Sequence, residues 1–251
     1  GSEMCIRDSY REAFGPLIPG IRFAEYNNLE SVKALVNKKT CAIICETVQG
    51  EGGIFPADKE FLEGLRKLCD ENDMLLILDE IQCGMGRTGS MFAYQQYGVM
   101  PDVVTSAKAL GCGIPVGAFV AGSKCDKGLV PGDHGTTYGG NPLATAAASK
   151  VFDLFAENDI IGHVNEVAPY LMERLKDFAG RHSSVKAVRG LGLMCGMQFK
   201  DELPVGNVVR AAREHGLIVI SAGLNTLRFV PPLIITKQNV DEMIDILEKC
   251  V

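Results

Sequence analysis

The chain has 251 residues, a length that fits one large domain or two small ones. Its composition, 47% hydrophobic and 22% charged, is that of an ordinary globular protein and excludes a disordered, collagen-like or coiled-coil chain. The net charge of −6 argues against a general binder of nucleic acid or of anionic membranes. The nine cysteines contain no C-x-x-C pair, so we expect free thiols in a reducing cytoplasm and no zinc site.

The first nine residues, GSEMCIRDS, differ in character from the rest of the chain. Gly1-Ser2 is typical of a tag-cleavage scar, and we interpret the stretch through Ser9 as translated tag or sequencing adapter. The fold is therefore expected to begin after residue 9.

Helical and strand-like patterns alternate through the first part of the chain. The expected elements are a helix at 29–38, a strand at 41–45, a helix from the cap Asp58 to about Asn72, strands at 74–78, 103–105 and 116–121, and a helix opened by Asn141-Pro142. The segments VQGEGG, QCGMGRTG and 131–140 are expected to be loops. Apolar strands separated by helices predict an α/β fold with a mostly parallel sheet covered on both faces.

The pattern of elements changes from about residue 158 onward, and a domain boundary is expected near residue 155. We expect a helix at 158–180, strands near 187–199, 217–221 and 226–230, and helices at 206–215 and 236–249. Two strands in close succession are typical of an antiparallel α+β unit. The sequence therefore predicts a large domain over 10–155 and a small C-terminal α+β domain over 156–251.

Three polar residues, Glu46, Asp79 and Lys108, follow directly after predicted strands. The carboxyl ends of parallel strands are where such sheets bind ligands. Apolar neighbours predict that Lys108 is partly buried and available as a nucleophile, although a solvated loop lysine is the common alternative. Asp79 could hold a cation or a protonated ring nitrogen, or could be a turn residue. The 29-residue spacing between Asp79 and Lys108 fits one strand–helix–strand step, and the pair suits pyridoxal phosphate.

Three other features of the sequence bear on the kind of site. Arg228, in the strand-like LRFVPPL, needs a carboxylate from the protein or from a substrate. The loop GMGRTG matches the dinucleotide pattern, but no helical pattern starts there, so a nucleotide-binding module is the weaker alternative. The four histidines show no i, i+4 pair, which argues against a zinc helix.

Four motifs in order resemble one enzyme family. These are CETVQGEGGIFPA, LILDEIQCGMGRTG, PDVVTSAKALGCGIPVGA and HGTTYGGNPLA. Together they resemble the class III pyridoxal-phosphate aminotransferases of fold type I, and the resemblance runs from about Phe14 to the C-terminus. The spellings QCGMGRTG and TTYGGNP are most similar to those of acetylornithine aminotransferases.

The resemblance implies a function. It implies transfer of an amino group from N-acetylornithine to 2-oxoglutarate, giving N-acetylglutamate 5-semialdehyde and glutamate, a step of arginine biosynthesis. Sibling enzymes that act on ornithine, 4-aminobutyrate or succinyldiaminopimelate are the alternatives. Family members carry roughly another third of chain before this start, including part of the cofactor cradle, so an inactive fragment is a further alternative.

The resemblance also implies roles for residues of this chain. Lys108 would form the Schiff base with the cofactor and shuttle the proton, and Asp79 would pair with the pyridinium nitrogen. Gln82 would contact the ring oxygen. Thr137 would bind the cofactor phosphate of a neighbouring subunit, which implies a homodimer with a shared active site.

Two further residues are implied to bind substrate. Arg228 would bind the α-carboxylate of glutamate or 2-oxoglutarate. Glu46 would pair with Arg228 and mask it when the donor carries its amine at the far end.

Overall fold

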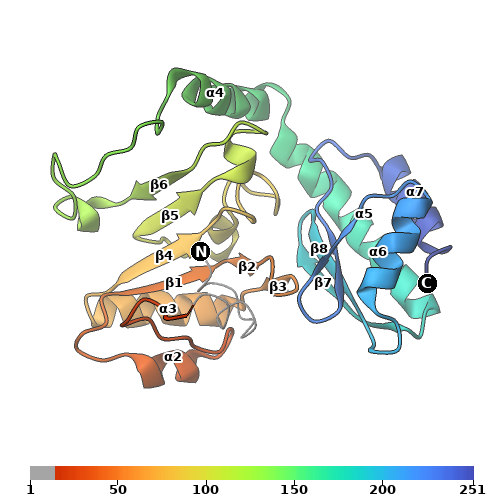
Figure 1. Cartoon of the computed structure of the whole chain (residues 1–251), viewed down its shortest axis with the longest axis horizontal. Helices are drawn as coiled ribbons and strands as arrows, with labels where there is room; N and C mark the ends of the chain where they lie inside the picture. Colours follow the sequence, from red (N-terminus) through yellow and green to blue (C-terminus); the bar gives the residue numbers. More distant parts are fainter. Residues whose placement is uncertain (1–14) are drawn as a thin grey trace.

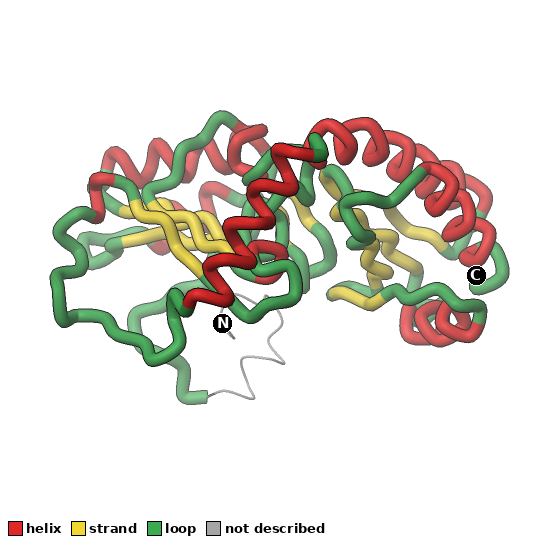
Figure 2. Tube along the Cα trace, turned by 90° about the horizontal axis from the view of Figure 1, so that it is seen from above, coloured by secondary structure: helices red, strands yellow, loops and turns green. Residues whose placement is uncertain are grey.

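Two four-stranded sheets and a two-stranded hairpin form the framework of the protein. A computed structural model describes residues 15–251, so the interpretation of residues 1–9 concerns residues outside those described. The two sheets lie side by side, one in each half of the sequence (Figure 1). Viewed at a right angle, they form separate groups of strands, each accompanied by helices (Figure 2).

The first sheet has the order β1-β4-β5-β6. Its strands are β1 Ala42–Glu46, β4 Leu75–Asp79, β5 Val103–Ser106 and β6 Ala118–Ala121. The first three strands are parallel, as predicted, whereas β6 runs antiparallel to β5. The register places Glu46 opposite Asp79, and Asp79 opposite Thr105. The carboxyl ends of β1, β4 and β5 therefore meet at one edge of the sheet.

The three helices before residue 158 lie close to the ranges that the sequence predicts. They are α2 Leu29–Leu35, α3 Lys59–Glu71 and α4 Pro142–Glu157. Asn141 caps α4 by accepting the Ala144 N–H at 3.0 Å. The apolar stripe of α3 packs on β4 through Leu62 and Leu65, which are fully buried.

Three expectations for the first half were wrong in detail. The β4–β5 connection contains only a 3-10 turn, Ala93–Tyr97, because the glycine-rich stretch before it includes positive φ at Gly86 and Gly89, which breaks a helix. The VQGEGG segment is not all loop, because β2 Val48–Gln49 and β3 Phe55–Pro56 pair across it. The sheet is not covered on both faces, since α3 packs on one side and Ile44 on the other is 51% exposed.

The second sheet is antiparallel, with the order β7-β8-β10-β9. Its strands are β7 Val185–Leu191, β8 Met194–Phe199, β9 Ile220–Ala222 and β10 Thr226–Phe229, and its helices are α5 Ile160–Arg181, α6 Val205–Glu214 and α7 Lys237–Leu247. This confirms the α+β pattern of the second half, while the domain boundary near residue 155 stays a prediction.

Strand alternation decides which side chains of the second sheet face the helices. Leu227 and Phe229 of β10 join the core formed with α5, α6 and α7. Thr226 and Arg228, at the alternate positions, lie on the opposite face. On that face Gly196 of β8 leaves room for Ile54 of the hairpin, because a Cβ at residue 196 would lie 2.9 Å from the Ile54 Cβ. The hairpin of the first half therefore packs on the second sheet.

A buried carboxylate joins the strand ends of the first sheet to the loop that follows β4. Glu80 is fully buried, and its Oε1 accepts the Thr47 hydroxyl at 2.7 Å and the Tyr94 N–H at 2.9 Å. Its Oε2 accepts the Ala93 N–H at 2.8 Å and the Cys83 thiol at 3.4 Å. Burial raises the pKa of Glu80, while these four donors oppose that rise.

Within residues 15–251, no helix combines the length and the apolar character that a membrane crossing requires.

We expect Glu80→Gln to lower the free energy of unfolding by about 2 to 3 kcal/mol, because the new amide NH2 would face donors that need an acceptor. Urea unfolding measures the change, with the exposed Glu202→Gln as the matched control. A Glu80→Gln protein as stable as the control would contradict the structural role of the carboxylate.

Candidate functional site

Asp79 and Lys108 lie at the carboxyl edge of the first sheet, together with Glu46. Asp79 is only 4% exposed, and its Oδ1 accepts the Ile81 N–H at 2.9 Å. The register places Glu46 opposite Asp79 on the neighbouring strand, and Lys108 follows the end of β5, the next strand of the sheet, by two residues. The structure thus brings together the three polar strand-end residues that the sequence singled out.

Lys108 differs from the prediction in one respect. It is exposed rather than partly buried, because β5 ends at Ser106 and the chain turns into a short 3-10 helix, Lys108–Leu110, in which Leu110 takes the buried position. The backbone of Lys108 is left-handed, with φ +47°. This conformation costs a non-glycine residue roughly 1–2 kcal/mol and is found where the surrounding structure requires it, often at functional sites.

Glu46 ends β1 and turns toward the hairpin. Its Oε2 accepts the Gly50 N–H at 2.9 Å. Burial raises the pKa of Glu46 to about 7, and the nearby Asp79 and Glu51 charges add to the rise. The Gly50 hydrogen bond and the Lys108 charge oppose it. Glu46 is therefore a carboxyl group that can change its protonation near neutral pH.

Arg228 has a carboxylate partner, as the sequence predicted, but the partner is not Glu46. Its Nη1 donates to Glu51 Oε1 at 2.6 Å and to Gln82 Oε1 at 3.1 Å. Gln82 in turn donates from Nε2 to Glu51 Oε1 at 3.2 Å. The expected Glu46–Arg228 pair is wrong, because Glu46 is held by Gly50 while the β2–β3 hairpin carries Glu51 to the second sheet.

Glu51 is the residue that the sequence reasoning missed. Its side chain is 48% exposed, whereas that of Arg228 is 10% exposed. Partial burial would raise the pKa of Glu51, but the hydrogen bond and charge of Arg228, with help from Gln82, hold it below its usual value. The available signal was an acidic residue inside the glycine-rich QGEGG, where a carboxylate rarely serves packing.

Gln82 occupies the space that Gly50 leaves. A Cβ at residue 50 would lie 2.3 Å from Gln82 Oε1, so any larger residue there would displace the amide. Gly50 thus allows the Gln82 amide to lie close to the backbone of this loop. Gln82 therefore lies between the first sheet and Arg228, beside the strand end that carries Asp79.

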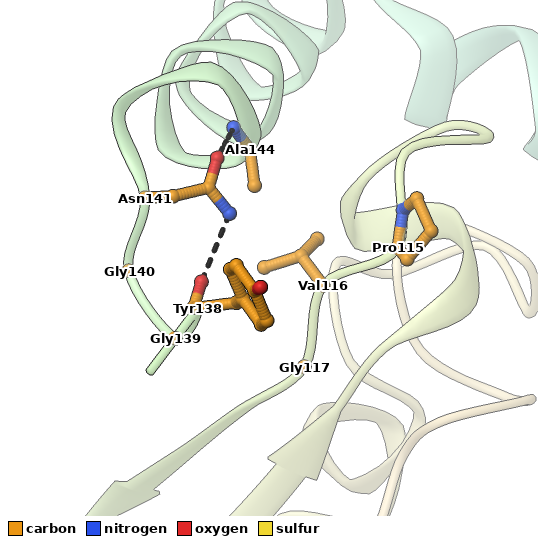
Figure 3. A pocket seen from close by; sticks show the side chains of 8 residues that line it. All are labelled: Pro115, Val116, Gly117, Tyr138, Gly139, Gly140, Asn141 and Ala144. Carbon is orange, nitrogen blue, oxygen red and sulfur yellow. Dashed lines mark hydrogen bonds between the residues drawn. The ribbon is translucent and has the colours of Figure 1, made fainter. Parts of the chain in front are cut away.

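Thr137 lies apart from this group. It is exposed in the segment before α4, next to a cavity of about 340 Å³ between that segment and the start of β6. Figure 3 shows Tyr138 and Asn141 on one side of this cavity and Val116 on the other, with Asn141 bonded to Ala144 and to the Tyr138 carbonyl. Within residues 15–251 nothing joins Thr137 to the Asp79 group.

The donor set at the sheet edge can be compared with the expected cofactor. Asp79 offers a buried carboxylate to a cationic ring nitrogen, and Lys108 offers an exposed amine to an aldehyde. Three buried polar atoms nearby, Thr105 Oγ1, Ser106 Oγ and Arg228 Nε, have no hydrogen-bond partner among the described residues. Such atoms are costly unless a ligand or an ordered water satisfies them. These residues fit pyridoxal phosphate.

Comparison with known proteins gives a family match over nearly the whole chain. Residues 4–251 match the family model described as Aminotransferase class-III. The chain is 46% identical over 248 residues to the mitochondrial acetylornithine aminotransferase of Debaryomyces hansenii, covering 97% of this chain and 53% of that protein. It is 44% identical over 243 residues to the acetylornithine aminotransferase of Clostridium acetobutylicum, covering 96% of this chain and 62% of that protein.

Solved structures agree with the sequence matches. An ornithine delta-aminotransferase of Plasmodium falciparum superposes with a TM-score of 0.88 at 36% identity, over 94% of this chain and 62% of that one. The N-acetylornithine aminotransferase of Stenotrophomonas maltophilia superposes with a TM-score of 0.82 at 38% identity, over 92% of this chain and 62% of that one. The chain thus spans between 53% and 62% of the length of these relatives.

We expect the Glu46 carboxyl to make stability depend on pH. Because its pKa is about 7 in the folded chain and 4.5 ordinarily, the folded state holds the extra proton between these values, and the free energy of unfolding falls as pH rises through that window. Glu46→Gln should remove this fall and gain about 1–3 kcal/mol at pH 8.5, with little change at the low end of the window.

Urea unfolding at the low end of the window and at pH 8.5 measures this effect. The control is again the exposed Glu202→Gln. It should change neither the free energy of unfolding nor its dependence on pH. If the free energy of unfolding of Glu46→Gln falls with pH as steeply as that of the wild type, another group binds the proton.

Proposed function

The chain belongs to the class-III aminotransferases, and from this premise we propose that it transfers an amino group from N-acetylornithine to 2-oxoglutarate. The products are N-acetylglutamate 5-semialdehyde and glutamate, and the reaction is a step of arginine biosynthesis. Relatives named acetylornithine aminotransferase, at 43–46% identity, support this donor. The structural observation that carries the proposal is the Arg228–Glu51 pair beside the Asp79 and Lys108 strand ends.

The Arg228–Glu51 pair supports the use of two unlike substrates at one site. Glutamate and 2-oxoglutarate carry a carboxylate next to the reacting carbon, and this group would replace Glu51 on Arg228 as a bidentate ligand. N-acetylornithine reacts at its far amine, where the carbon chain has no carboxylate. For that donor Glu51 would stay on Arg228, so that no guanidinium is left unpaired in a buried site.

Pyridoxal phosphate supplies an aldehyde and an electron-withdrawing ring that stabilises negative charge on the substrate carbon. Lys108 would hold the cofactor through Nζ and carry the proton to and from the substrate carbon. Asp79 would hold the proton on the ring nitrogen, a role for which its burial at the sheet edge is suited. Gln82 would hold the ring oxygen. Glu46, with a pKa raised to about 7 by burial, adds no full negative charge near Lys108 below neutral pH.

We propose that a second copy of the chain completes the site. Thr137 is exposed and separate from the Asp79 group, which is consistent with a hydroxyl that serves the cofactor phosphate of a neighbouring subunit. The eight cysteines of the described residues are free thiols, which supports the cytoplasm as the place of action, although one relative is named as mitochondrial.

Ornithine is the second candidate donor. The observation that favours it is the likeness to ornithine aminotransferase structures, at a TM-score of 0.88 and 36% identity for the one from Plasmodium falciparum. The remaining alternatives are an activity on 4-aminobutyrate or succinyldiaminopimelate and a chain without activity. The same assay of glutamate formation can test each of them.

We expect the purified chain mixed with pyridoxal phosphate to develop a new absorption band, because Lys108 offers a free amine beside Asp79. Borohydride reduction and peptide mapping should then find the label on Lys108. The matched control is Lys108→Ala, compared with the exposed Lys67→Ala. A label on scattered surface lysines, with none on Lys108, would contradict the proposed pocket.

We expect glutamate to form from 2-oxoglutarate at least about tenfold faster with N-acetylornithine than with free ornithine, by kcat/KM, as a difference of about 1.4 kcal/mol in transition-state binding would give. Coupled glutamate detection measures both donors under one set of conditions. A preference for free ornithine would move the assignment to the sibling enzyme.

A further inference from the structure

Arg189 is a guanidinium in the second sheet whose partners are not carboxylates. It lies on β7, partly buried, and burial lowers its pKa. Among residues 15–251 no acidic side chain pairs with it. A buried positive charge without a counter-charge is costly unless its N–H groups are hydrogen-bonded. The acceptors of Arg189 therefore indicate what this side chain does.

One side of the Arg189 guanidinium holds the β2–β3 hairpin. Its Nε donates to the Gly53 carbonyl at 2.8 Å and to the Ile54 carbonyl at 2.9 Å. The guanidinium carbon also lies 4.0 Å from the centre of the Phe55 ring, within the range of a cation–π contact. Three consecutive residues of the hairpin are therefore fixed by one side chain.

The other side of the guanidinium holds the second sheet. Nη2 donates to the Thr226 hydroxyl at 3.1 Å, and Nη1 donates to Gln198 Oε1 at 2.9 Å. Thr226 is fully buried and lies on β10 two residues before Arg228, so both side chains are on the same face. Arg189 thus connects the hairpin that carries Glu51 to the strand that carries Arg228.

The tip of the hairpin is bonded to the β9–β10 turn as well as to Arg189. The Gly223 N–H donates to the Glu51 carbonyl at 2.9 Å. Gly53 has φ +121°, and a Cβ there would lie 2.8 Å from the Gly223 carbonyl oxygen and 3.1 Å from Arg189 Nη2. A displacement of the hairpin caused by loss of Arg189 would therefore reach the Glu51 backbone.

We propose that Arg189 is a positioning residue that sets how firmly Glu51 pairs with Arg228, and hence how easily a dicarboxylate replaces Glu51. The second half of this statement rests on the proposed function, in which Arg228 binds the substrate carboxylate. The first half concerns residues of this chain alone. Arg189 acts through the hairpin and touches neither of the reacting groups.

The first test needs no ligand. The carboxyl carbon of Glu51 can be titrated by ¹³C NMR in the wild-type chain, with its resonance assigned by its loss in Glu51→Gln. Because Arg228 holds the pKa of Glu51 below its usual value, loosening the pair should move that pKa upward. We expect a rise of about half a pH unit or more in Arg189→Met, and a smaller rise in Arg189→Lys, which keeps the charge but loses the planar fork.

The control for this titration is Arg210→Met, the same chemical change at an exposed position of α6. It should leave the Glu51 titration where it is in the wild type. If Arg189→Met does not fold, Arg189→Lys carries the test alone. A Glu51 pKa that is the same in folded Arg189 variants and in the wild type overturns the proposal.

The second test measures by calorimetry how tightly the chain binds glutarate, a dicarboxylate without an amine. We expect Arg189→Met to tighten glutarate binding about fivefold when Glu51 is present and to change it less than about twofold in the Glu51→Gln background. A residue that only stabilises the sheet would have the same effect in both backgrounds, and that result would overturn the proposal.

Arg228→Met separates the two proposals. If glutarate binding is unaffected by this change, the substrate role of Arg228 fails, and the Glu51 titration alone decides whether Arg189 positions the pair. If glutarate binding depends on Arg228 but not on Arg189 in either background, the proposed function stands and the inference about Arg189 falls.

Discussion

The site depends on a hairpin that leaves one sheet and packs on the other. Val48–Gln49 and Phe55–Pro56 pair with each other, follow β1 directly, and bring Ile54 against Gly196 of the second sheet. Without this crossing, the carboxylate and amide near the first sheet could not reach Arg228. The crossing is fixed at its base by the buried Glu80, which accepts the Thr47 hydroxyl, and at its tip by hydrogen bonds from Arg189 and Gly223.

Two charged groups buried at the site, Arg228 and Glu80, are offset by their neighbours. Arg228 is offset by Glu51, and Glu80 is offset by four donors instead of a cation. Among the described residues the Glu46 carboxylate accepts one hydrogen bond, from the Gly50 N–H, and it has two acidic neighbours, so that burial raises its pKa to about 7. At Glu46 desolvation thus outweighs hydrogen bonding, and its carboxyl group can take up a proton near neutral pH.

Much of the fold and part of the site could be predicted from the sequence, for physical reasons that differ between elements. Helical periodicity located α3 because one face of that helix is buried, and a short apolar run located β4 because the strand lies in the core beneath α3. The strand ends at Asp79 and Glu46 followed from parallel pairing. The exposure of Lys108 could not be predicted, since it depends on a left-handed backbone after β5. The Glu51–Arg228 pair could not be predicted either, because it joins residues 177 positions apart through a hairpin with only two residues in each strand.

The unequal exposure of the two paired side chains determines which of them moves when the pair opens. Arg228 is enclosed at 10% exposure, and its strand is hydrogen-bonded on both sides, whereas Glu51 is 48% exposed on a hairpin whose backbone is fixed. Opening the pair therefore requires only a rotamer change of one glutamate, a motion of picoseconds to nanoseconds for an exposed side chain. Access to the guanidinium is then limited by the strength of the ion pair, and no slow loop opening has to precede binding.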